Sequence, residues 1–353
     1  MLCPGCAQPV HYYNLRAQFV PILLHWAVMR QKRQLLDRLR DGHFHSGTAL
    51  GLQLGISRSA IWKEIRLLGS LGHEIHAVPG RGYRLAHPVE ALDEAAIRAT
   101  FNPQAQRLLG NINILDEIDS TNLYLLQQAS TGAASGTACL AEQQHAGRGR
   151  HGRTWISPPG GNIYLSLLWR FSMTPTAVGG VSLAVAVAVV RALRAAGLTH
   201  TGLKWPNDIL WQGRKLAGIL LDMAGEVSGP CHLVAGVGLN VAMPAHAVSA
   251  IDQPWVDLRT ALDPLPARNL LAGLLLQHLL LALHEFQQRG LAPFMQEWEQ
   301  LDLIKGTRIT LNHGGQPVHG VAQGVAADGA LNLLVNGVTR RYYSGEVSLQ
   351  KPS

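Results

Sequence analysis

The chain has 353 residues, of which 47% are apolar and 15% charged, and its formal net charge is +7. This composition is typical of a globular protein with two or three domains and excludes a disordered or fibrous one. The positive charge is concentrated, because residues 29–86 hold ten Lys and Arg against four Asp and Glu, whereas the two signs balance over residues 87–353. Such a basic segment attracts polyanions, so a nucleic acid is a candidate partner.

The N-terminal residues 1–28 are interpreted as a leader whose role the sequence leaves open. Cys3 and Cys6 have zinc-knuckle spacing, but a structural zinc site needs four ligands and no second Cys-x-x-Cys follows, so zinc is disfavoured there. The apolar run 20–29 is only ten residues long and is interrupted by His25. It is too short to cross a bilayer.

Two further features bear on the cellular compartment. The longer apolar run 270–286 contains Gln277, His278 and His284, which favours a buried helix over a membrane span. Cys139 lies in a strand-like run where a buried thiol is expected, and four cysteines in a chain of this length do not form a disulfide framework. We therefore expect a cytoplasmic protein with no membrane partner.

Residues 29–86 carry the pattern of a helix, a turn and a second helix. Ser46 can cap a helix that runs through Leu54, and Gly55 permits the sharp turn that follows. Ser57 can then cap the second helix. This order predicts a helix-turn-helix motif.

The second helix has an apolar and a polar face. Ile61, Ile65 and Leu68 recur at helical spacing and are expected to pack inward. The outer set consists of Arg58, Ser59, Trp62, Lys63 and Arg66. A basic outer face at this position is typical of a helix that enters the major groove of DNA.

A short hairpin follows the two helices. Residues 74–78 and 83–85 can pair as strands around the tip 79–82, which carries Arg81. The hairpin completes a winged helix in which Arg81 meets a DNA phosphate. The DNA-binding candidates are Arg58, Ser59, Lys63, Arg66 and Arg81. The alternative is a three-helix protein-interaction module with a solvated basic face, but the concentration of charge favours DNA.

The rest of the chain divides into a connector and two folded parts. A connector is expected over 87–110, because the residue before Pro88 is biased away from helix. Over 111–303, strand-like runs alternate with helical runs, which predicts a mixed sheet covered by helices. Over 304–353, short strand-like runs separated by Gly and Asn predict a small barrel of about five strands. The strand-like runs of the middle part are 113–116, 137–142, 162–169, 216–223 and 233–241, and its helical runs are 120–128, 178–196 and 270–289.

The segment 147–153, with sequence GRGRHGR, is the first candidate for a chemical site. Its glycines let the backbone approach a ligand closely, and its arginines supply fixed positive charge that suits a phosphate-bearing ligand. It is not a Walker A loop, because no Gly-Lys-Ser/Thr follows. On composition alone it could equally be a flexible basic surface loop.

Downstream segments add to this candidate site. Lys215 enters an otherwise apolar strand in 214–220 (RKLAGIL), shortly after the polar turn 204–208 (KWPND). A lysine there either stays solvated or points into a site and neutralises a carboxylate or phosphate. The glycines of 236–240 (GVGLN) could admit a flat ligand or mark a β-bulge.

Together these segments resemble the biotin protein ligases, from about Met29 to Leu349. The stretch GRGRHGRTW fits the family signature GRGRxGRxW, and the segments 204–208, 214–220 and 236–240 follow in the family's order. The winged helix in front narrows the resemblance to the bifunctional ligase-repressor type. The resemblance implies an α/β (α+β) chain with an N-terminal winged helix-turn-helix, a central mixed-sheet, class II synthetase-like catalytic domain, and a C-terminal SH3-like β-barrel.

The resemblance also implies site residues. Those that match contacts to biotin are Ser120, Thr121, Asn122, Gln144, Gly147, Arg148, Gly149, Arg150, Lys215 and Gly236. Those on the nucleotide side are Arg150, Arg153, Asn207, Asp208, Asn240 and Trp255. Lys215, Arg148 and Arg150 are the catalytic candidates, because fixed positive charge offsets charge that builds on the phosphates. Two alternatives stay open, since Ser120 could simply cap the helix that follows and Trp255 could be a core tryptophan.

One segment departs from the family. The family has a nucleotide-ordering loop at the position of 242–254, and this chain is rich in Ala, Pro and His there. How that loop packs is therefore left open by the sequence.

The activity that the resemblance implies has two parts. Biotin and ATP with Mg²⁺ form biotinyl-5'-AMP, from which biotin passes to a lysine of the biotin carboxyl carrier protein; the residues that would hold the metal stay undefined. Operator DNA and a ligand-promoted homodimer would make the chain a biotin-responsive repressor. One alternative is a lipoate ligase-like acyl-adenylate transferase, against which the intact GRGRHGR argues. The other is a regulator that senses biotin without catalysis.

Overall fold

The computed structural model describes residues 32, 34–70, 72–86, 90–174, 178–225 and 229–349. The chain forms two compact units, Met1–Pro88 and Val89–Ser353, and each is described by itself. The expected leader 1–28, with Cys3 and Cys6, lies outside the described residues.

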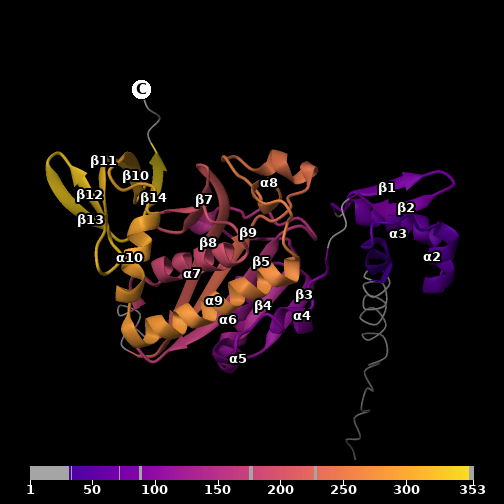
Figure 1. Ribbon diagram of the computed structural model, residues 1–353, viewed down its shortest axis with the longest axis horizontal. Helices are drawn as coiled ribbons and strands as arrows, with labels where there is room; N and C mark the ends of the chain where they lie inside the picture. The colour runs from indigo at the N-terminus through magenta and orange to yellow at the C-terminus, as the bar shows by residue number, and fades with distance from the viewer. Residues whose placement is uncertain are drawn as a thin grey trace, which may run out of the picture. The chain divides into compact units, whose positions relative to one another are not determined.

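The first unit contains the predicted winged helix (Figure 1). The Ser46 hydroxyl accepts the Ala49 N–H at 3.1 Å, and the helix that begins there ends at Gly55, whose φ is 67°. The Ser57 hydroxyl accepts the Ala60 N–H at 3.1 Å at the start of the second helix. The elements are a helical segment at 34–39, α2 (Gly47–Leu54), α3 (Arg58–Ser70), β1 (Ile75–Val78) and β2 (Gly82–Leu85).

The core of the first unit includes the apolar residues of α3 that the helical spacing predicted to be buried. Ile61, Ile65 and Leu68 of α3 are buried and pack with leucines of the other elements. The polar outer face of α3 is exposed, as predicted. The helix-turn-helix and its hairpin are therefore confirmed.

The second unit is built on a mixed sheet of seven strands, in the order β3-β4-β5-β9-β8-β7-β6. The pair β3–β4 is parallel and the other neighbouring strands are antiparallel. The strands are β3 (Ile112–Ile118), β4 (Ala138–Gln144), β5 (Ile163–Phe171), β6 (Gly202–Lys204), β7 (Asp208–Trp211), β8 (Arg214–Gly225) and β9 (Cys231–Leu239). The helices are α4 (Glu94–Arg98), α5 (Pro103–Leu108), α6 (Thr121–Ser130), α7 (Val181–Ala195), α8 (Leu258–Ala261), α9 (Arg268–Arg289) and α10 (Ala292–Leu301). The predicted mixed sheet covered by helices is confirmed.

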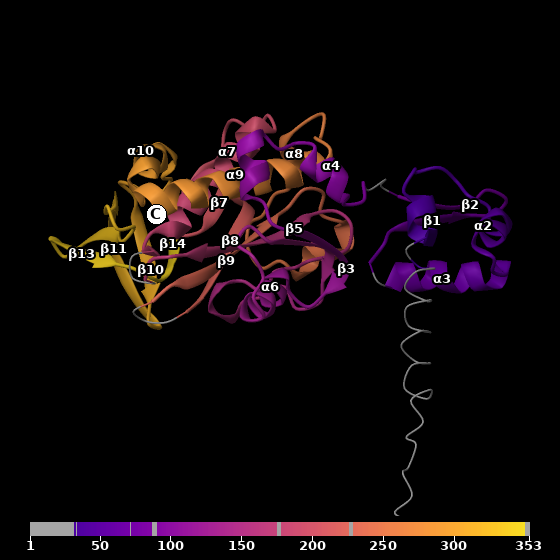
Figure 2. The same cartoon turned by 90° about the horizontal axis from the view of Figure 1, so that it is seen from below.

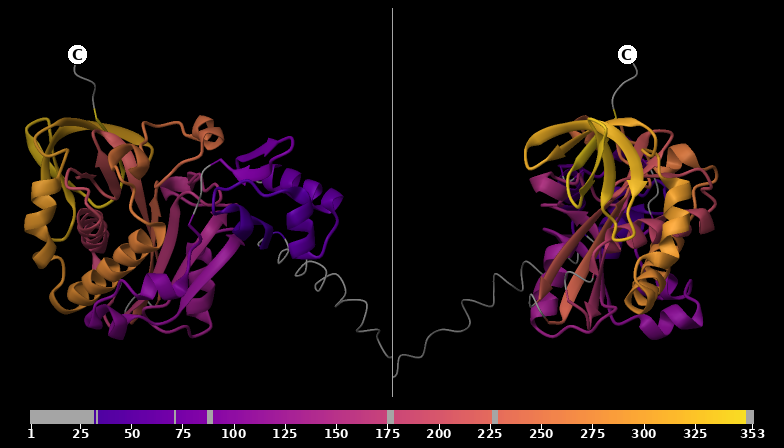
Figure 3. Two further views of the ribbon diagram at one scale, coloured as in Figure 1. Left: turned by 45° about the vertical axis from the view of Figure 1, so that its right-hand side comes forward. Right: turned by 90° about the vertical axis from the view of Figure 1, so that its left-hand side faces the viewer.

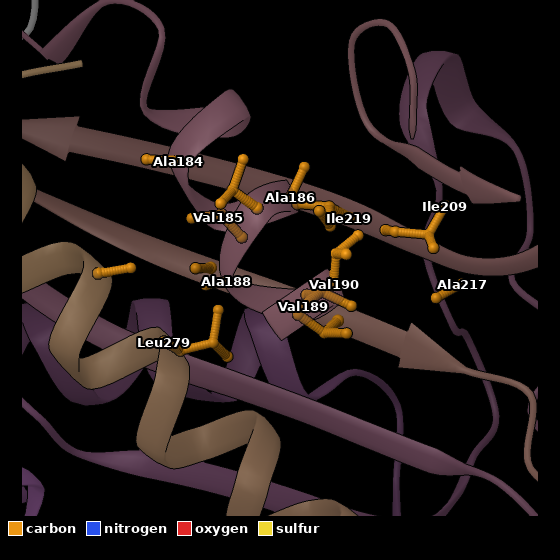
Figure 4. Packing of buried hydrophobic residues seen from close by; sticks show 14 of the residues in the cluster. Ala184, Val185, Ala186, Ala188, Val189, Val190, Ile209, Ala217, Ile219 and Leu279 are labelled. Carbon is orange, nitrogen blue, oxygen red and sulfur yellow. The ribbon is translucent and has the colours of Figure 1, made fainter. Parts of the chain in front are cut away.

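Helices cover both faces of this sheet. Figure 2 shows α7 and α9 on one side and α6 on the other. Successive side chains of β5 therefore pack on opposite faces of the sheet. Leu167 belongs to the large core beneath α7 and α9, whereas Leu168 packs in the smaller cluster with Leu125 of α6. Figure 4 shows side chains of α7, including Val190, in the same apolar cluster as Ile219 of β8. The α6 face is the one that carries the candidate site.

Helix α9 is the described helix that is long and apolar enough to cross a membrane, by length and composition. However, 61% of its most apolar window is buried inside the protein. Leu275, Leu279 and Leu283 belong to the core that α9 shares with α7. It is therefore the buried helix that its internal polar residues had indicated.

The segment 90–110, expected as a connector, carries two short helices that pack against α9. The backbone N–H of Leu92 donates to Glu142 Oε1 at 2.9 Å, and Ile97 is buried. Asp93 and Asn102 cap the two helices. Helices of five and six residues are too short for helical periodicity to appear in the sequence, which explains the difference.

The C-terminal part of the second unit is an antiparallel sheet with the five strands that the sequence predicted (Figure 3). Their order is β13-β12-β11-β10-β14. Trp205 Nε1 donates to the carbonyl of Gly329 at 3.1 Å, which joins this sheet to the central one. The strands are β10 (Arg308–His313), β11 (Gln316–Val325), β12 (Leu331–Val335), β13 (Val338–Tyr342) and β14 (Glu346–Leu349).

Candidate functional site

A cavity of about 380 Å³ lies on the α6 face of the central sheet. Its size is that of a small-molecule site. The start of α6, the loop after β4, the strands β5, β8 and β9, the segment 250–253 and Glu346 of β14 all contribute to its lining. The structure brings these predicted site residues into that lining: Ser120, Thr121, Asn122, Gln144, Arg148, Gly149, Arg150, Arg153, Asn207, Asp208, Lys215 and Gly236.

The floor of the cavity is made of glycines in neighbouring strands. Gly236 of β9 pairs with Ser166 of β5 and Leu220 of β8, and Gly238 pairs with Gly218 of β8. The register is continuous through these pairs, so the glycines do not mark a bulge. They open the sheet surface because they lack side chains, which resolves the alternative left by the sequence.

Gly236 also makes room for Asn122. A Cβ at position 236 would lie 2.1 Å from Asn122 Oδ1, closer than any real contact. We expect Gly236→Ala to displace the Asn122 amide and to weaken binding of biotin, the ligand that the sequence resemblance implies, by about tenfold or more, because buried hydrogen bonds are then lost. Biotin titration of the purified variant measures this. Gly69→Ala is the control, since a methyl group there meets no described atom within 4 Å, and an equal loss in that variant would contradict the steric explanation.

Polar groups form one wall of the cavity. The backbone N–H and the hydroxyl of Thr121 both donate to Gln144 Oε1, at 2.9 and 3.1 Å, and Gln144 Nε2 donates to Ser157 Oγ at 3.1 Å. Ser120 occupies the N-cap position, but its hydroxyl makes no capping hydrogen bond to the described first turn of α6. The wall therefore offers fixed donors and acceptors, and capping does not account for Ser120.

Acidic and basic side chains meet at another part of the lining. Lys215 Nζ lies 2.8 Å from Asp208 Oδ1, and Lys204 Nζ lies 3.1 Å from Asp208 Oδ2. Burial would raise the pKa of the Asp208 carboxyl, but the two lysines outweigh it and hold that pKa below its ordinary value. Asp208 is thus a carboxylate between two ammonium groups, and of the two lysines Lys215 lines the cavity.

The segment 147–153 forms a tight hairpin at the cavity. The N–H of Gly149 donates to Arg153 O at 2.7 Å, and the N–H of Trp155 donates to Gly147 O at 2.9 Å. Gly147 is required at the base, because a Cβ there would lie 2.4 Å from Trp155 O. Backbone hydrogen bonds therefore fix the segment, unlike the flexible surface loop that composition alone allowed.

Each arginine of this hairpin has a partner on another element. Arg148 contacts Asp222 of β8, with Nη1 to Oδ2 at 3.3 Å. Arg150 Nη1 donates to Asn207 Oδ1 at 3.3 Å, and Arg153 pairs with Glu346 of the C-terminal sheet. With Lys215, the arginines give the cavity the fixed positive charge that an anionic ligand needs.

Three predicted residues do not belong to the lining: Gly147, Asn240 and Trp255. Asn240 is buried, and its Nδ2 donates to the carbonyls of Lys215 at 3.4 Å and Val256 at 3.2 Å. It fixes the backbone that carries Lys215. Trp255 forms a backbone bridge with Lys215 and is half-buried. The predicted contacts of Asn240 and Trp255 with the nucleotide, and that of Gly147 with biotin, stay predictions.

Three residues that sequence reasoning had given no role belong to the site. Trp155 covers the glycine floor, because a Cβ on Gly238 would lie 2.4 Å from its ring. Asp222 and Glu346 hold arginines of the hairpin. An aromatic residue two positions after the Gly-Arg segment and an acidic residue in an apolar strand were available signals, whereas Glu346 lies too far away in the chain to be found.

No group of three or more His, Cys, Asp or Glu that could hold a metal ion occurs among the described residues. Of the three carboxylates in the lining, Asp208 and Glu346 already pair with basic side chains, and Asp252 is exposed to solvent. This donor set does not fit a magnesium site made by the protein alone.

The first unit presents the predicted DNA-binding residues on its surface. Arg58, Ser59, Lys63 and Arg66 are exposed on α3, and the Arg66 guanidinium lies 4.9 Å from the centre of the Trp62 ring. Arg81 is exposed in the hairpin, where its guanidinium lies 4.3 Å from the centre of the Phe44 ring. Basic groups are thus present on both the second helix and the wing.

Family models match three consecutive parts of the chain. The model of an HTH domain matches residues 31–84, that of the Biotin/lipoate A/B protein ligase family matches residues 114–240, and that of the Biotin protein ligase C terminal domain matches residues 305–350. The three matches coincide with the winged helix, the central sheet and the C-terminal sheet.

Known proteins match over most of the length. The bifunctional ligase/repressor BirA of Escherichia coli (strain K12) is 40% identical over 317 residues, 90% of this chain and 96% of that protein. BirA of Bacillus subtilis (strain 168) is 31% identical over 310 residues, 87% of this chain and 94% of that protein. Among solved structures, the biotin protein ligase from Aquifex aeolicus in complex with biotin and ATP is similar with a TM-score of 0.58 and 26% identity, covering 69% of this chain and 100% of that one.

Proposed function

This chain belongs to the biotin protein ligase family, and we propose that it activates biotin with ATP, transfers it to a lysine of an acceptor protein, and represses transcription in response to biotin. Its likeness to bifunctional ligase/repressors extends over both the winged helix and the ligase part. The observation that carries the ligase proposal is the cavity, in which polar groups and fixed positive charges converge on a glycine floor.

The two parts of the lining suit the two ends of biotin. A ureido ring needs both donors and acceptors, which Ser120, Thr121 and Gln144 supply. A carboxylate and the phosphates need cations, which Arg148, Arg150 and Lys215 supply. The chemistry of the lining therefore supports binding in which the biotin carboxylate faces Arg148, Arg150 and Lys215.

Adenylation then needs positioning and charge stabilisation. A biotin carboxylate oxygen attacks the α-phosphorus of ATP, the bond from that phosphorus to pyrophosphate breaks, and pyrophosphate leaves with the electron pair. Arg148, Arg150 and Lys215 offset the negative charge that builds on the phosphate oxygens. The Mg²⁺ ion enters as part of the Mg-ATP substrate.

Transfer uses the activated carbonyl of biotinyl-5'-AMP. The lysine amine of the acceptor, proposed to be the biotin carboxyl carrier protein, attacks that carbonyl, the amide bond forms, and AMP leaves. No covalent intermediate with the enzyme is needed. The buried free thiols of Cys139 and Cys231 support the proposal that this happens in a reducing cytoplasm.

The test is pyrophosphate exchange into ATP by the purified protein. Exchange that depends on biotin, followed by transfer of biotin to an acceptor domain, is the expected result. Exchange with lipoate in place of biotin would instead support the lipoate ligase alternative. No exchange with either acid would leave a regulator that senses biotin without catalysis.

The repressor proposal predicts that the adenylate promotes dimerisation. One winged helix offers a single half-site, so a two-fold dimer is needed to contact two half-sites. Ligand contacts with the side chains of Arg148 and Arg150 and with the cavity-lining residues Asp252 and Gln253 would fix those side chains and lower the entropy lost on association.

We expect biotinyl-5'-AMP to strengthen dimerisation by about 5- to 150-fold, the usual range of coupling between sites. Sedimentation and operator binding at fixed salt, with and without the adenylate, measure this. Biotin alone is the control and should have a smaller effect. Equal dimerisation and equal operator affinity in all samples would leave a ligase with an independent DNA-binding module.

A further inference from the structure

Asp222 of β8 joins two residues of the cavity lining without belonging to the lining itself. Its Oδ2 accepts hydrogen bonds from Asn122 Nδ2 at 2.9 Å and from Arg148 Nη1 at 3.3 Å. Its Oδ1 accepts from Arg148 Nη2 at 3.4 Å. One carboxylate thus connects the start of α6 with the hairpin 147–153.

The connection continues into the rigid floor of the site. Asn122 Oδ1 lies 2.5 Å from Ser166 Oγ on β5, and Asn122 Nδ2 also donates to the carbonyl of Leu220 at 3.2 Å. Gly236 leaves the space that the Asn122 amide fills, because a Cβ at position 236 would collide with the amide. Asn122 is therefore held by two strands of the sheet and provides a fixed point for Asp222.

Arg148 is the more exposed end of this connection. Its side chain is 39% exposed, whereas that of Asp222 is 20% exposed. A guanidinium on a half-exposed hairpin samples many rotamers unless a partner fixes its plane, and two parallel contacts with one carboxylate do so. Without Asp222, Arg148 would become ordered only when the ligand binds. The conformational entropy that the Arg148 side chain then loses would weaken ligand binding.

We propose that Asp222 is a positioning residue of the adenylation site, which holds Arg148 at the cavity and Asn122 on its floor before biotin binds. The inference rests on the proposed function, because these two residues are assigned there as biotin contacts. Asp222 acts through them and touches neither biotin nor the phosphates. Its loss therefore affects affinity more than the rate of the chemical step.

The experiment measures pyrophosphate exchange and the release of biotinyl-5'-AMP by Asp222→Asn. We expect the KM for biotin and the release rate each to rise about tenfold, as when a charge-assisted hydrogen bond is removed. The kcat of exchange should fall by no more than about threefold, because Arg148 remains in the variant and can still offset charge on the phosphates once the ligand has ordered it. Glu285→Gln is the matched control, since it removes a surface pair with Arg289 at 3.1 Å and should leave both quantities unchanged.

Further variants separate positioning from a general structural role. Asp222→Glu keeps the carboxylate and should restore the KM for biotin to within about threefold of the wild type. In the Arg148→Ala background, Asp222→Asn should add little further loss, because residues that act through one another are not additive. If Asp222→Asn does not fold, Asp222→Ser, which keeps an acceptor for Asn122, gives the same comparison.

Several outcomes would overturn the proposal. An unchanged KM in Asp222→Asn would show that Arg148 needs no partner, and a lower KM would show that the carboxylate competes with the ligand. Fully additive losses in the double variant would show that Asp222 does not act through Arg148. If the wild-type protein itself shows no exchange with biotin, it is the proposed function that fails.

Discussion

Lys215→Gln is expected to slow the formation of biotinyl-5'-AMP by about 10²- to 10³-fold, the loss measured when one preorganised group is removed from a transition state. Lys215 lines the cavity at the start of β8, beside the Asn207 and Asp208 turn. Its ammonium group would meet the biotin carboxylate and the α-phosphate, where charge builds during the reaction. Biotin-dependent pyrophosphate exchange measures the loss.

Folding of this variant should survive. Lys215→Gln removes the ammonium group 2.8 Å from Asp208, but Lys204 remains at 3.1 Å from the same carboxylate, so no buried charge is left without a partner. The melting temperature of the variant relative to the wild type checks this point.

Lys204→Gln is the matched control for Lys215→Gln. Both variants remove one ammonium group from Asp208, but Lys204 does not line the described cavity. We expect exchange by Lys204→Gln to stay within about fivefold of the wild type, because the group removed is not at the transition state. Equal losses in the two variants would show that Lys215 acts only by holding Asp208, and near-normal exchange by Lys215→Gln would refute its catalytic role.

Deletion of residues 1–88 is expected to abolish specific operator binding, a loss of at least about 10³-fold relative to the full chain. The deletion removes the compact first unit and the segment that carries nearly all of the excess positive charge. Adenylation should persist, because the cavity lining lies within the second unit. Operator titration and biotin-dependent pyrophosphate exchange on the same preparation measure both effects.

A point-mutant series refines the deletion. Alanine at Arg58, Lys63 or Arg66 should reduce the slope of log affinity against log salt by about 0.9 for each phosphate that the variant no longer neutralises. Alanine at Arg289, an exposed residue of α9, is the control and should leave the slope unchanged. Specific operator binding by the truncated protein would show that DNA recognition resides outside the winged helix.

The winged helix could be predicted from the sequence because its signals are local. Capping by Ser46 and Ser57 involves an amide three residues further along, and Gly55 adopts the left-handed conformation that its lack of Cβ permits. The buried face of α3 follows from a spacing of three to four residues. Each of these signals can be read without knowledge of distant parts of the chain.

The candidate site could be predicted only in part. Composition marked the hairpin and Lys215 as positively charged, and family resemblance added the polar residues at the start of α6. Asn240 does not line the cavity, because its side chain donates to the carbonyls of Lys215 and Val256 instead, and the sequence does not show those contacts. Likewise, the short helices after Pro88 pack against α9, which their own sequences do not indicate.

The helix-turn-helix, the alternation of strands and helices, and the chemical character of the hairpin follow from local sequence, because hydrogen bonds and side-chain spacing within a few residues produce these features. The position of Asn122 over Gly236, and the contact of Arg148 with Asp222, 74 residues further along the chain, depend on the folded structure. Strand order and register bring such residues together. Many registers satisfy the same alternation of apolar and polar residues, and packing of the whole sheet selects one of them.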